Sequence, residues 1–90
     1  MPMTRTARLC FEGRFVVSSF AEFVERRAAR LDVDVVVRKA GDRLFLIEVT
    51  GQPDLIDAFE MACSLGPLDC LVLDCRSVAL AAMEMERSDR

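Results

Sequence analysis

Residues able to hold an anion gather where the sequence predicts that a strand gives way to a helix. The stretch GRFVVSSFAEF, residues 13–23, contains Arg14, Ser18 and Ser19. A guanidinium offers a planar fork of donors to an oxyanion, and a hydroxyl donates as well. The N-terminus of a helix adds free N–H groups and partial positive charge, which attract phosphate. These three side chains are therefore anion-binding candidates.

The same stretch also has an ordinary structural interpretation. Val16 and Val17 stand where a loop that cradles phosphate would have glycines. Ser18 or Ser19 suits the N-cap of the helix, because Glu22 follows Ser19 at the spacing of a capping box. We expect helix capping to be the main role of the two serines, with anion binding as the alternative.

The cysteines do not predict a metal site. The chain has four cysteines and no histidine. A zinc site typically needs closely spaced pairs of ligands, and no CxxC pair is present. Free cysteine in an apolar run behaves as a small hydrophobic residue. We therefore expect reduced, structural cysteines, no metal and no cofactor, for the set Cys10, Cys63, Cys70 and Cys75.

The composition excludes several classes of partner. Asp and Glu number 15 against 12 Lys and Arg, giving a net charge of −3, whereas nucleic-acid binding relies on clustered cations. The chain has no run of about 18 apolar residues that would span a membrane. Residues 1–10 lack the apolar core of a signal peptide. We expect a cytoplasmic protein that binds neither nucleic acid nor membranes.

Hydrophobic periodicity predicts a mixed α and β domain. Alternation over residues 7–13 indicates a half-buried strand, and Phe20, Val24 and Ala28 recur at helical spacing. Pro53 suits the first turn of a second helix. The expected elements are a strand over 7–13, a helix over 18–31, strands over 34–39 and 44–51, a helix within 51–67 and a strand over 70–75.

This order is β-α-β-β-α-β, and the two βαβ halves share a central hairpin. Right-handed crossovers then place both helices on one face of the sheet. The predicted fold class is α+β, a ferredoxin-like plait with a four-stranded antiparallel sheet and two helices on one face. We expect one domain over residues 6–78, with an N-terminal arm over 1–5 and a C-terminal tail over 79–90.

The chain resembles the acylphosphatase family over residues 6–78. That family carries a loop of the form G-R-V-Q-G-V-G-F-R-x-F, and the corresponding stretch of this chain is G-R-F-V-V-S-S-F-A-E-F. Further on, VVVRKAGDRLFLIEVTG and CSLGP lie at matching distances. The residues that carry the resemblance are Gly13, Arg14, Phe20, Phe23, Val37, Arg38, Gly51, Gly66 and Pro67.

The resemblance implies hydrolysis of acyl phosphates, with three working parts. A glycine-rich loop cradles the phosphate, an arginine pairs with it, and an asparagine positions the attacking water. In this chain the arginine position falls at Ala21, the asparagine position at Lys39, and the loop glycines at Val17 and Ser19. The catalytic motif is therefore degenerate, and we predict no catalytic residue. Lys39 can replace the lost cation, so it joins Arg14 and the two serines as an anion-binding candidate.

Three functions follow from these observations. The first is a catalytically inactive acylphosphatase-like domain that binds a protein or a small ligand. The second is a weak or altered acylphosphatase. The third is an unrelated ferredoxin-like module that binds a regulatory ligand, because this fold serves many functions.

The alternation of the strands also predicts which side chains face the helices. This set is Leu9, Phe11, Val35, Val37, Phe45, Ile47, Val49, Leu71, Leu73 and Cys75. The opposite, open face has an apolar centre, and an exposed apolar patch marks an interaction surface. We predict a homodimer through this face, with the 78–85 tail as a competing cover. The interface candidates are Cys10, Val36, Leu44, Leu46 and Val72.

Overall fold

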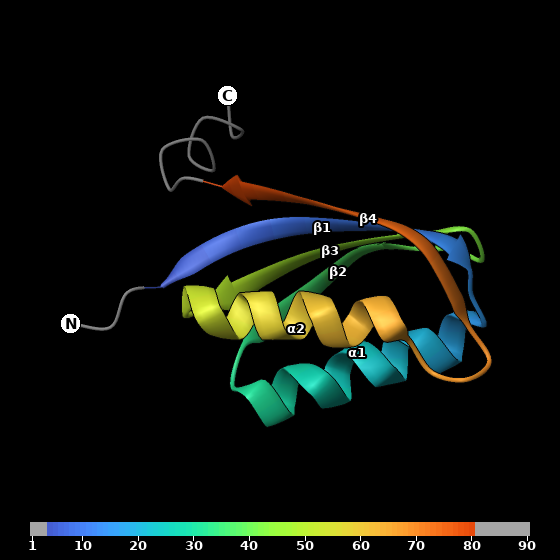
Figure 1. Cartoon of the computed structure of the whole chain (residues 1–90), viewed down its shortest axis with the longest axis horizontal. Helices are drawn as coiled ribbons and strands as arrows, with labels where there is room; N and C mark the ends of the chain where they lie inside the picture. Colours follow the sequence, from blue (N-terminus) through green and yellow to red (C-terminus); the bar gives the residue numbers. More distant parts are fainter. Residues whose placement is uncertain (1–3, 81–90) are drawn as a thin grey trace.

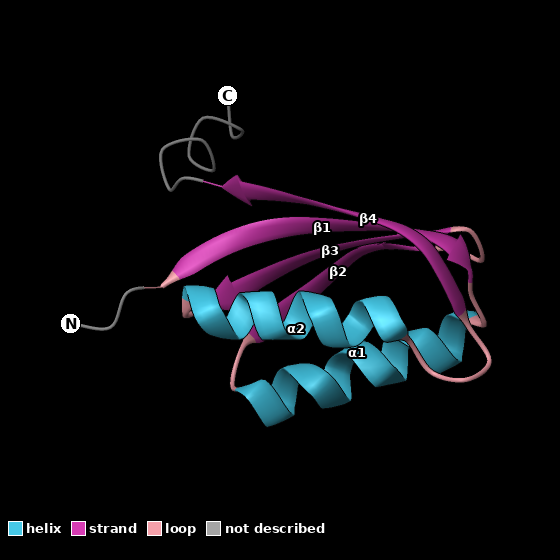
Figure 2. Ribbon diagram, in the orientation of Figure 1, coloured by secondary structure: helices cyan, strands magenta, loops and turns pink. Residues whose placement is uncertain are grey.

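The computed structural model describes residues 4–80 and has the predicted order of elements. Both helices lie on one side of a single sheet, and within residues 4–80 no helix or strand covers the other side (Figure 1). The ribbon diagram shows the same two layers (Figure 2). The elements are β1 (Arg5–Arg14), α1 (Val17–Leu31), β2 (Asp34–Ala40), β3 (Leu44–Gly51), α2 (Pro53–Leu65) and β4 (Leu71–Leu80).

The sheet has the order β2-β3-β1-β4, and each neighbouring pair is antiparallel. The ferredoxin-like prediction is therefore confirmed. β1 and β3 are central, so their inward side chains are buried, as the alternation predicts. β2 and β4 are the two edges.

The core lies between the central strands and the helices. Phe20 and Val24 of α1 and Phe59 of α2 are fully buried against Leu9 and Ile47 of the sheet. Cys63 is also fully buried, and burial raises the pKa of its thiol to about 12. This cysteine is structural, as predicted.

Both helices end at a residue with positive φ. Asp32 caps α1 with φ 59°, and its N–H group lies at the Ala28 and Ala29 carbonyls. Gly66 ends α2 with φ 66°, a conformation that glycine adopts without strain. Pro53 and Asp54 occupy the first turn of α2, where the sequence predicts them.

The prediction for β4 is wrong in two respects. The strand runs to Leu80, beyond the predicted 70–75 and two residues past the predicted domain end at 78. Its inward side also differs, because Cys70 and Val72 pack against the core whereas Leu71 and Leu73 are 53% and 68% exposed. The remainder of the predicted tail lies outside the described residues.

A register irregularity explains the inversion. Glu12 pairs with Asp74 but Gly13 pairs with Val72, so β4 carries one extra residue, Leu73. An extra residue shifts the alternation of every position before it. A Cβ on residue 13 would collide with the Leu71 carbonyl oxygen, so glycine at this position allows the close approach.

Within residues 4–80, neither helix has the length and apolar character needed to cross a membrane.

Candidate functional site

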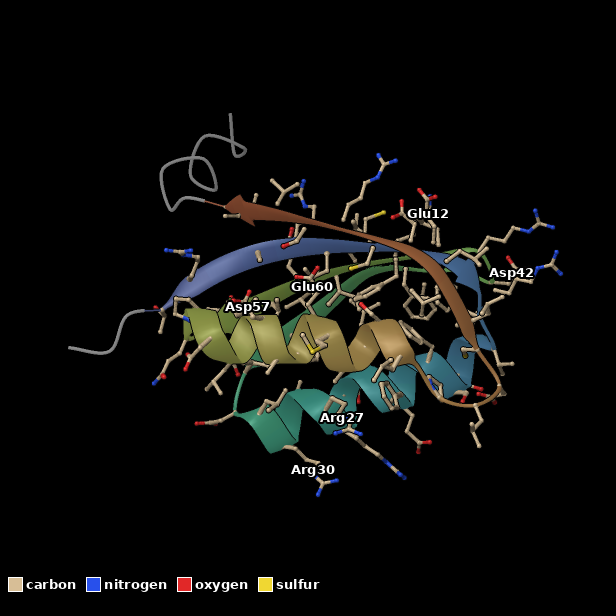
Figure 3. The ribbon with its side chains drawn as sticks, in the orientation of Figure 1. Glu12, Arg27, Arg30, Asp42, Asp57 and Glu60 are labelled. Carbon is tan, nitrogen blue, oxygen red and sulfur yellow. The ribbon has the colours of Figure 1, made fainter. Side chains whose placement is uncertain are left out.

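The candidate site is the junction between β1 and α1, residues 13–20. β1 ends at Arg14 and α1 begins at Val17, so two residues connect them. The Gly13 N–H donates to the Arg43 carbonyl at 3.1 Å, and the Phe15 N–H donates to the Asp42 carbonyl at 2.8 Å. The β2–β3 turn therefore fixes the backbone of the junction, and Asp42 lies at this end of the molecule (Figure 3).

Aromatic rings build the inner side of the junction. The Phe20 ring centroid lies 4.7 Å from that of Phe15, 4.7 Å from that of Phe45 and 5.6 Å from that of Phe11. Tilted and edge-on ring pairs at these separations are favourable beyond the area that they bury. All four rings are buried, so packing determines where α1 begins.

The outer side carries the predicted anion-binding serines. Ser18 is exposed, and the Ser19 Oγ donates to Asp69 Oδ1 at 2.8 Å. The prediction that either serine is the N-cap is wrong. Val16 holds the N-cap position, without a side-chain hydrogen bond, because the helix begins before the serines and includes them in its first turn.

The α2–β4 connection, residues 66–70, packs against this outer side. Besides the bond from Ser19 to Asp69, the Cys70 Sγ donates to the Val16 carbonyl at 3.8 Å. Burial is the main cause that raises the pKa of the Cys70 thiol. Asp69 thus places a carboxylate beside the first turn of α1, where the helix dipole favours negative charge.

Sequence reasoning missed Asp69. It lies 50 residues from Ser19 in the chain, and a lone aspartate after Gly66-Pro67 is typical of a solvated turn. No local pattern pairs it with the first helix. Only the packing of the two connections brings these side chains together.

The remaining candidates are spread around the junction. Arg14 is exposed opposite Leu71, and Lys39 is exposed on β2 opposite Leu46. Ala21 is partly buried and packs against the core. Within residues 4–80, no side-chain hydrogen bond or ion pair joins Arg14, Ser18 and Lys39 to one another.

No residue of the junction has positive φ. In the described part of the chain, positive φ occurs at Asp32 and Gly66 only. Val17 and Ser19, at the positions of the family's loop glycines, are helical. The strain that β-branched residues would suffer at positive φ is therefore avoided, because both positions are helical.

The open sheet face combines a small apolar group with charges. Glu48 accepts from Arg38 at 3.0 Å and from Arg8 at 3.1 Å, and its side chain is only 12% exposed. The hydrogen bond from Arg38 is the main cause that lowers the pKa of the Glu48 carboxyl, against an opposing contribution from burial. This ion-paired group lies in the same cross-strand row as Val36 and Val78.

The predicted interface residues do not all lie on that face. Leu46 and Cys10 are cross-strand neighbours, and Leu44 lies beside them on β3. Val36 is separated from this group by Glu48. Val72 packs against the core and is removed from the set, because the extra residue in β4 turns it inward. The homodimer through this face stays a prediction.

Side chains of α2 and β4 meet beside the sheet. Asp57 and Glu60 point from α2 toward the sheet (Figure 3). The Cys75 Sγ donates to Glu60 Oε2 at 3.5 Å, and burial followed by the nearby Glu60 carboxylate raises the pKa of Cys75 to about 12. Such a thiol stays protonated at neutral pH, so it does not suit nucleophilic chemistry.

Comparison with solved structures identifies the architecture. An acylphosphatase from Coxiella burnetii matches with a TM-score of 0.78 and 17% identity, over 87% of this chain and 82% of that chain. An acylphosphatase from Bacillus subtilis matches with a TM-score of 0.79 and 22% identity, over 91% of this chain and 90% of that chain. The fold is that of the acylphosphatases.

A third match is to a much longer protein. Full-length HypF, in its phosphate- and nucleotide-bound form, matches with a TM-score of 0.75 and 19% identity. The match covers 93% of this chain but 11% of HypF. Neither the protein-family models nor the curated protein sequences give a match. The acylphosphatase fold is thus established from structure, at low sequence identity.

Proposed function

We propose that this chain is an acylphosphatase-fold domain that does not hydrolyse acyl phosphates and acts by binding a protein partner. The observation that carries the proposed loss of hydrolysis is the 2.8 Å hydrogen bond from Ser19 to Asp69. It sets a carboxylate against the first turn of α1, where the family resemblance places the phosphate. A phosphate approaching this turn would meet a negative charge rather than an arginine.

Two substitutions support the same proposal. Ala21 occupies the position that the resemblance assigns to the arginine, and its side chain packs inward. Lys39 occupies the asparagine position and offers no acceptor for a hydrogen bond from water. Removing one well-placed donor from an active site typically costs about 10²–10³ in kcat, so losing both parts brings turnover to background.

Acyl phosphate hydrolysis is the second candidate, and the fold favours it. In the described residues no side chain caps α1, so backbone N–H groups of its first turn remain available to an anion. Lys39 or Arg14 would then supply the charge. A direct assay separates the two proposals.

The test is hydrolysis of benzoyl phosphate beside the Bacillus subtilis acylphosphatase as the active standard. We expect the wild-type chain to stay at the uncatalysed rate. Turnover within tenfold of the standard would contradict the proposal.

A repair experiment tests the role of Asp69. Asp69→Asn removes the charge, and Ala21→Arg with Lys39→Asn restores the two family side chains. We expect phosphate to shift the Val17–Ser19 amide resonances in the triple variant, but not in the variant that keeps Asp69. Equal phosphate shifts with and without Asp69 would show that its carboxylate does not block the site.

A further inference from the structure

β4 is an edge strand, and within residues 4–80 its outer side has no partner strand. Its hydrogen-bonded partner is β1. Past the extra residue Leu73, the pairing of Asp74–Leu80 with β1 is regular. A regularly paired edge of this kind presents unpaired N–H and C=O groups that another strand can join.

The other edge is better protected. The pairing of β2 with β3 is irregular between Val37 and Lys39, and the strand carries two basic residues, Arg38 and Lys39, near its end at Ala40. Irregular pairing and basic side chains are usual devices against strand addition. The two edges therefore differ, and β4 is the one open to a partner.

The charges of β4 are complementary to themselves. Asp74 and Arg76 flank Cys75 and form an exposed ion pair at 3.3 Å, with side chains 48% and 74% exposed. If a second β4 runs antiparallel about a two-fold axis at Cys75, Asp74 of each copy lies opposite Arg76 of the other. Opposite charges directly across a strand pair stabilise it, and like charges oppose it.

Neighbouring registers lack this complementarity. Residues that lie directly opposite one another in an antiparallel pair point to the same face of the sheet, and neighbours along a strand point to opposite faces. The helices of both copies therefore lie on the same side of the joint sheet only if the two-fold axis passes beside one residue, which then lies opposite its own copy. An axis at Asp74 sets aspartate against aspartate, and an axis at Arg76 sets arginine against arginine. The charge pattern therefore selects the register at Cys75.

The shape of the strand fits the same register. Leu73 protrudes, with 68% of its surface exposed. The axis at Cys75 places Leu73 of one copy opposite Ser77 of the other, which is a small and exposed residue. The contact occurs twice, as two-fold symmetry requires.

We propose that a second copy of this chain adds to β4, antiparallel about a two-fold axis at Cys75, and extends the sheet across both copies. Strand-edge contacts bury little area, so the dimer is weak and forms at tens to hundreds of micromolar protein. This proposal names the partner of the interaction role proposed above. Sedimentation measures self-association and the benzoyl phosphate assay measures hydrolysis. The dimer proposal can therefore fail while the proposal on hydrolysis stands, and the reverse.

Charge reversal tests the register. Asp74→Arg gives two arginines on β4, and Arg76→Asp gives two aspartates, so each single variant sets like charges opposite one another. We expect each to weaken self-association by at least about tenfold in sedimentation equilibrium. Mixing the two variants should restore a dimer, because every cross-strand pair is then opposite in charge. The double variant Asp74→Arg with Arg76→Asp should also dimerise.

Two controls test whether the variants still fold and whether the dimer uses β4 rather than the open sheet face. Far-ultraviolet circular dichroism of each variant shows that these exposed substitutions leave the fold intact. Leu46→Glu charges the open sheet face and should leave the β4 dimer unchanged. A wild-type chain that stays monomeric at hundreds of micromolar overturns the proposal. So do single variants that dimerise as wild type does, or loss of the dimer in Leu46→Glu.

Discussion

The inner side of the β1–α1 junction consists of packed aromatic rings, whereas its outer side carries exposed and polar side chains. On the inner side, Phe15 and Phe20 pack among buried rings, and backbone bonds to Asp42 and Arg43 fix the chain. On the outer side, Val16 and Ser18 are exposed, and Ser19 contacts Asp69. The inner side therefore determines the conformation of the junction, whereas the outer side determines what it can bind. A fold can keep its scaffold while its chemistry changes, since separate residues carry the two properties.

The largest expected effect is on the inner side. Phe20→Ala removes a fully buried ring that pairs with four others, and should lower the free energy of unfolding by about 3–5 kcal/mol. Urea denaturation gives this value. Phe23→Ala is the matched control, because Phe23 is only partly buried on the same helix. If Phe23→Ala lowered the free energy of unfolding as much as Phe20→Ala does, the inner rings would not be what fixes the junction.

A smaller effect is expected where β1 approaches β4. Gly13→Ala puts a Cβ against the Leu71 carbonyl oxygen, so the strands must separate, at about 1–3 kcal/mol of unfolding free energy. Gly41→Ala is the control, since the nearest atom to its new Cβ is the Leu44 carbonyl oxygen at 3.4 Å. Amide chemical shifts of residues 70–74 should change in the first variant and stay in place in the second. Unchanged shifts in Gly13→Ala would contradict the proposed cause of the irregularity in β4.

The stability that the open sheet face contributes should depend on pH. Glu48 has a lowered pKa in the folded state, so its stabilising contribution is present above the unfolded value near 4.5 and is lost as pH falls through the folded value. Glu48→Gln should therefore flatten the pH dependence of stability below about pH 5, by about 1 kcal/mol or less, because both arginines are exposed. Urea midpoints at pH 7 and pH 3 measure it. Parallel pH profiles for wild type and variant would show that the ion pairs add nothing.

The smallest effect is expected on the outer side of the junction. Ser19→Ala removes one exposed hydrogen bond, so unfolding free energy should change by about 1 kcal/mol at most. The same variant removes the Ser19 hydrogen bond from the Asp69 carboxylate, which nuclear magnetic resonance would detect as a change in its carbon shift. A loss comparable to that of Phe20→Ala would mean that the outer contact, and not the aromatic packing, fixes the junction.

Local sequence patterns were sufficient for the order of elements and for most of the core. Alternation along β1 and β3 predicted Leu9, Phe11, Phe45, Ile47 and Val49 as buried, because both strands are regular and lie in the centre of the sheet. Pro53 and Gly66 marked the ends of α2 through constraints on their own backbone.

Tertiary structure alone decided the rest. Leu71 and Leu73 were predicted inside and lie outside, and Val72 does the reverse, because a strand register depends on the residue across the sheet and not on its own periodicity. The start of α1 at Val17 follows from aromatic packing, which overrides the capping preference of the serines. The contact of Ser19 with Asp69 joins residues 50 positions apart, and no local pattern encodes such a distance. The sequence by itself therefore determined the framework, whereas three-dimensional packing decided which charges meet at the candidate site.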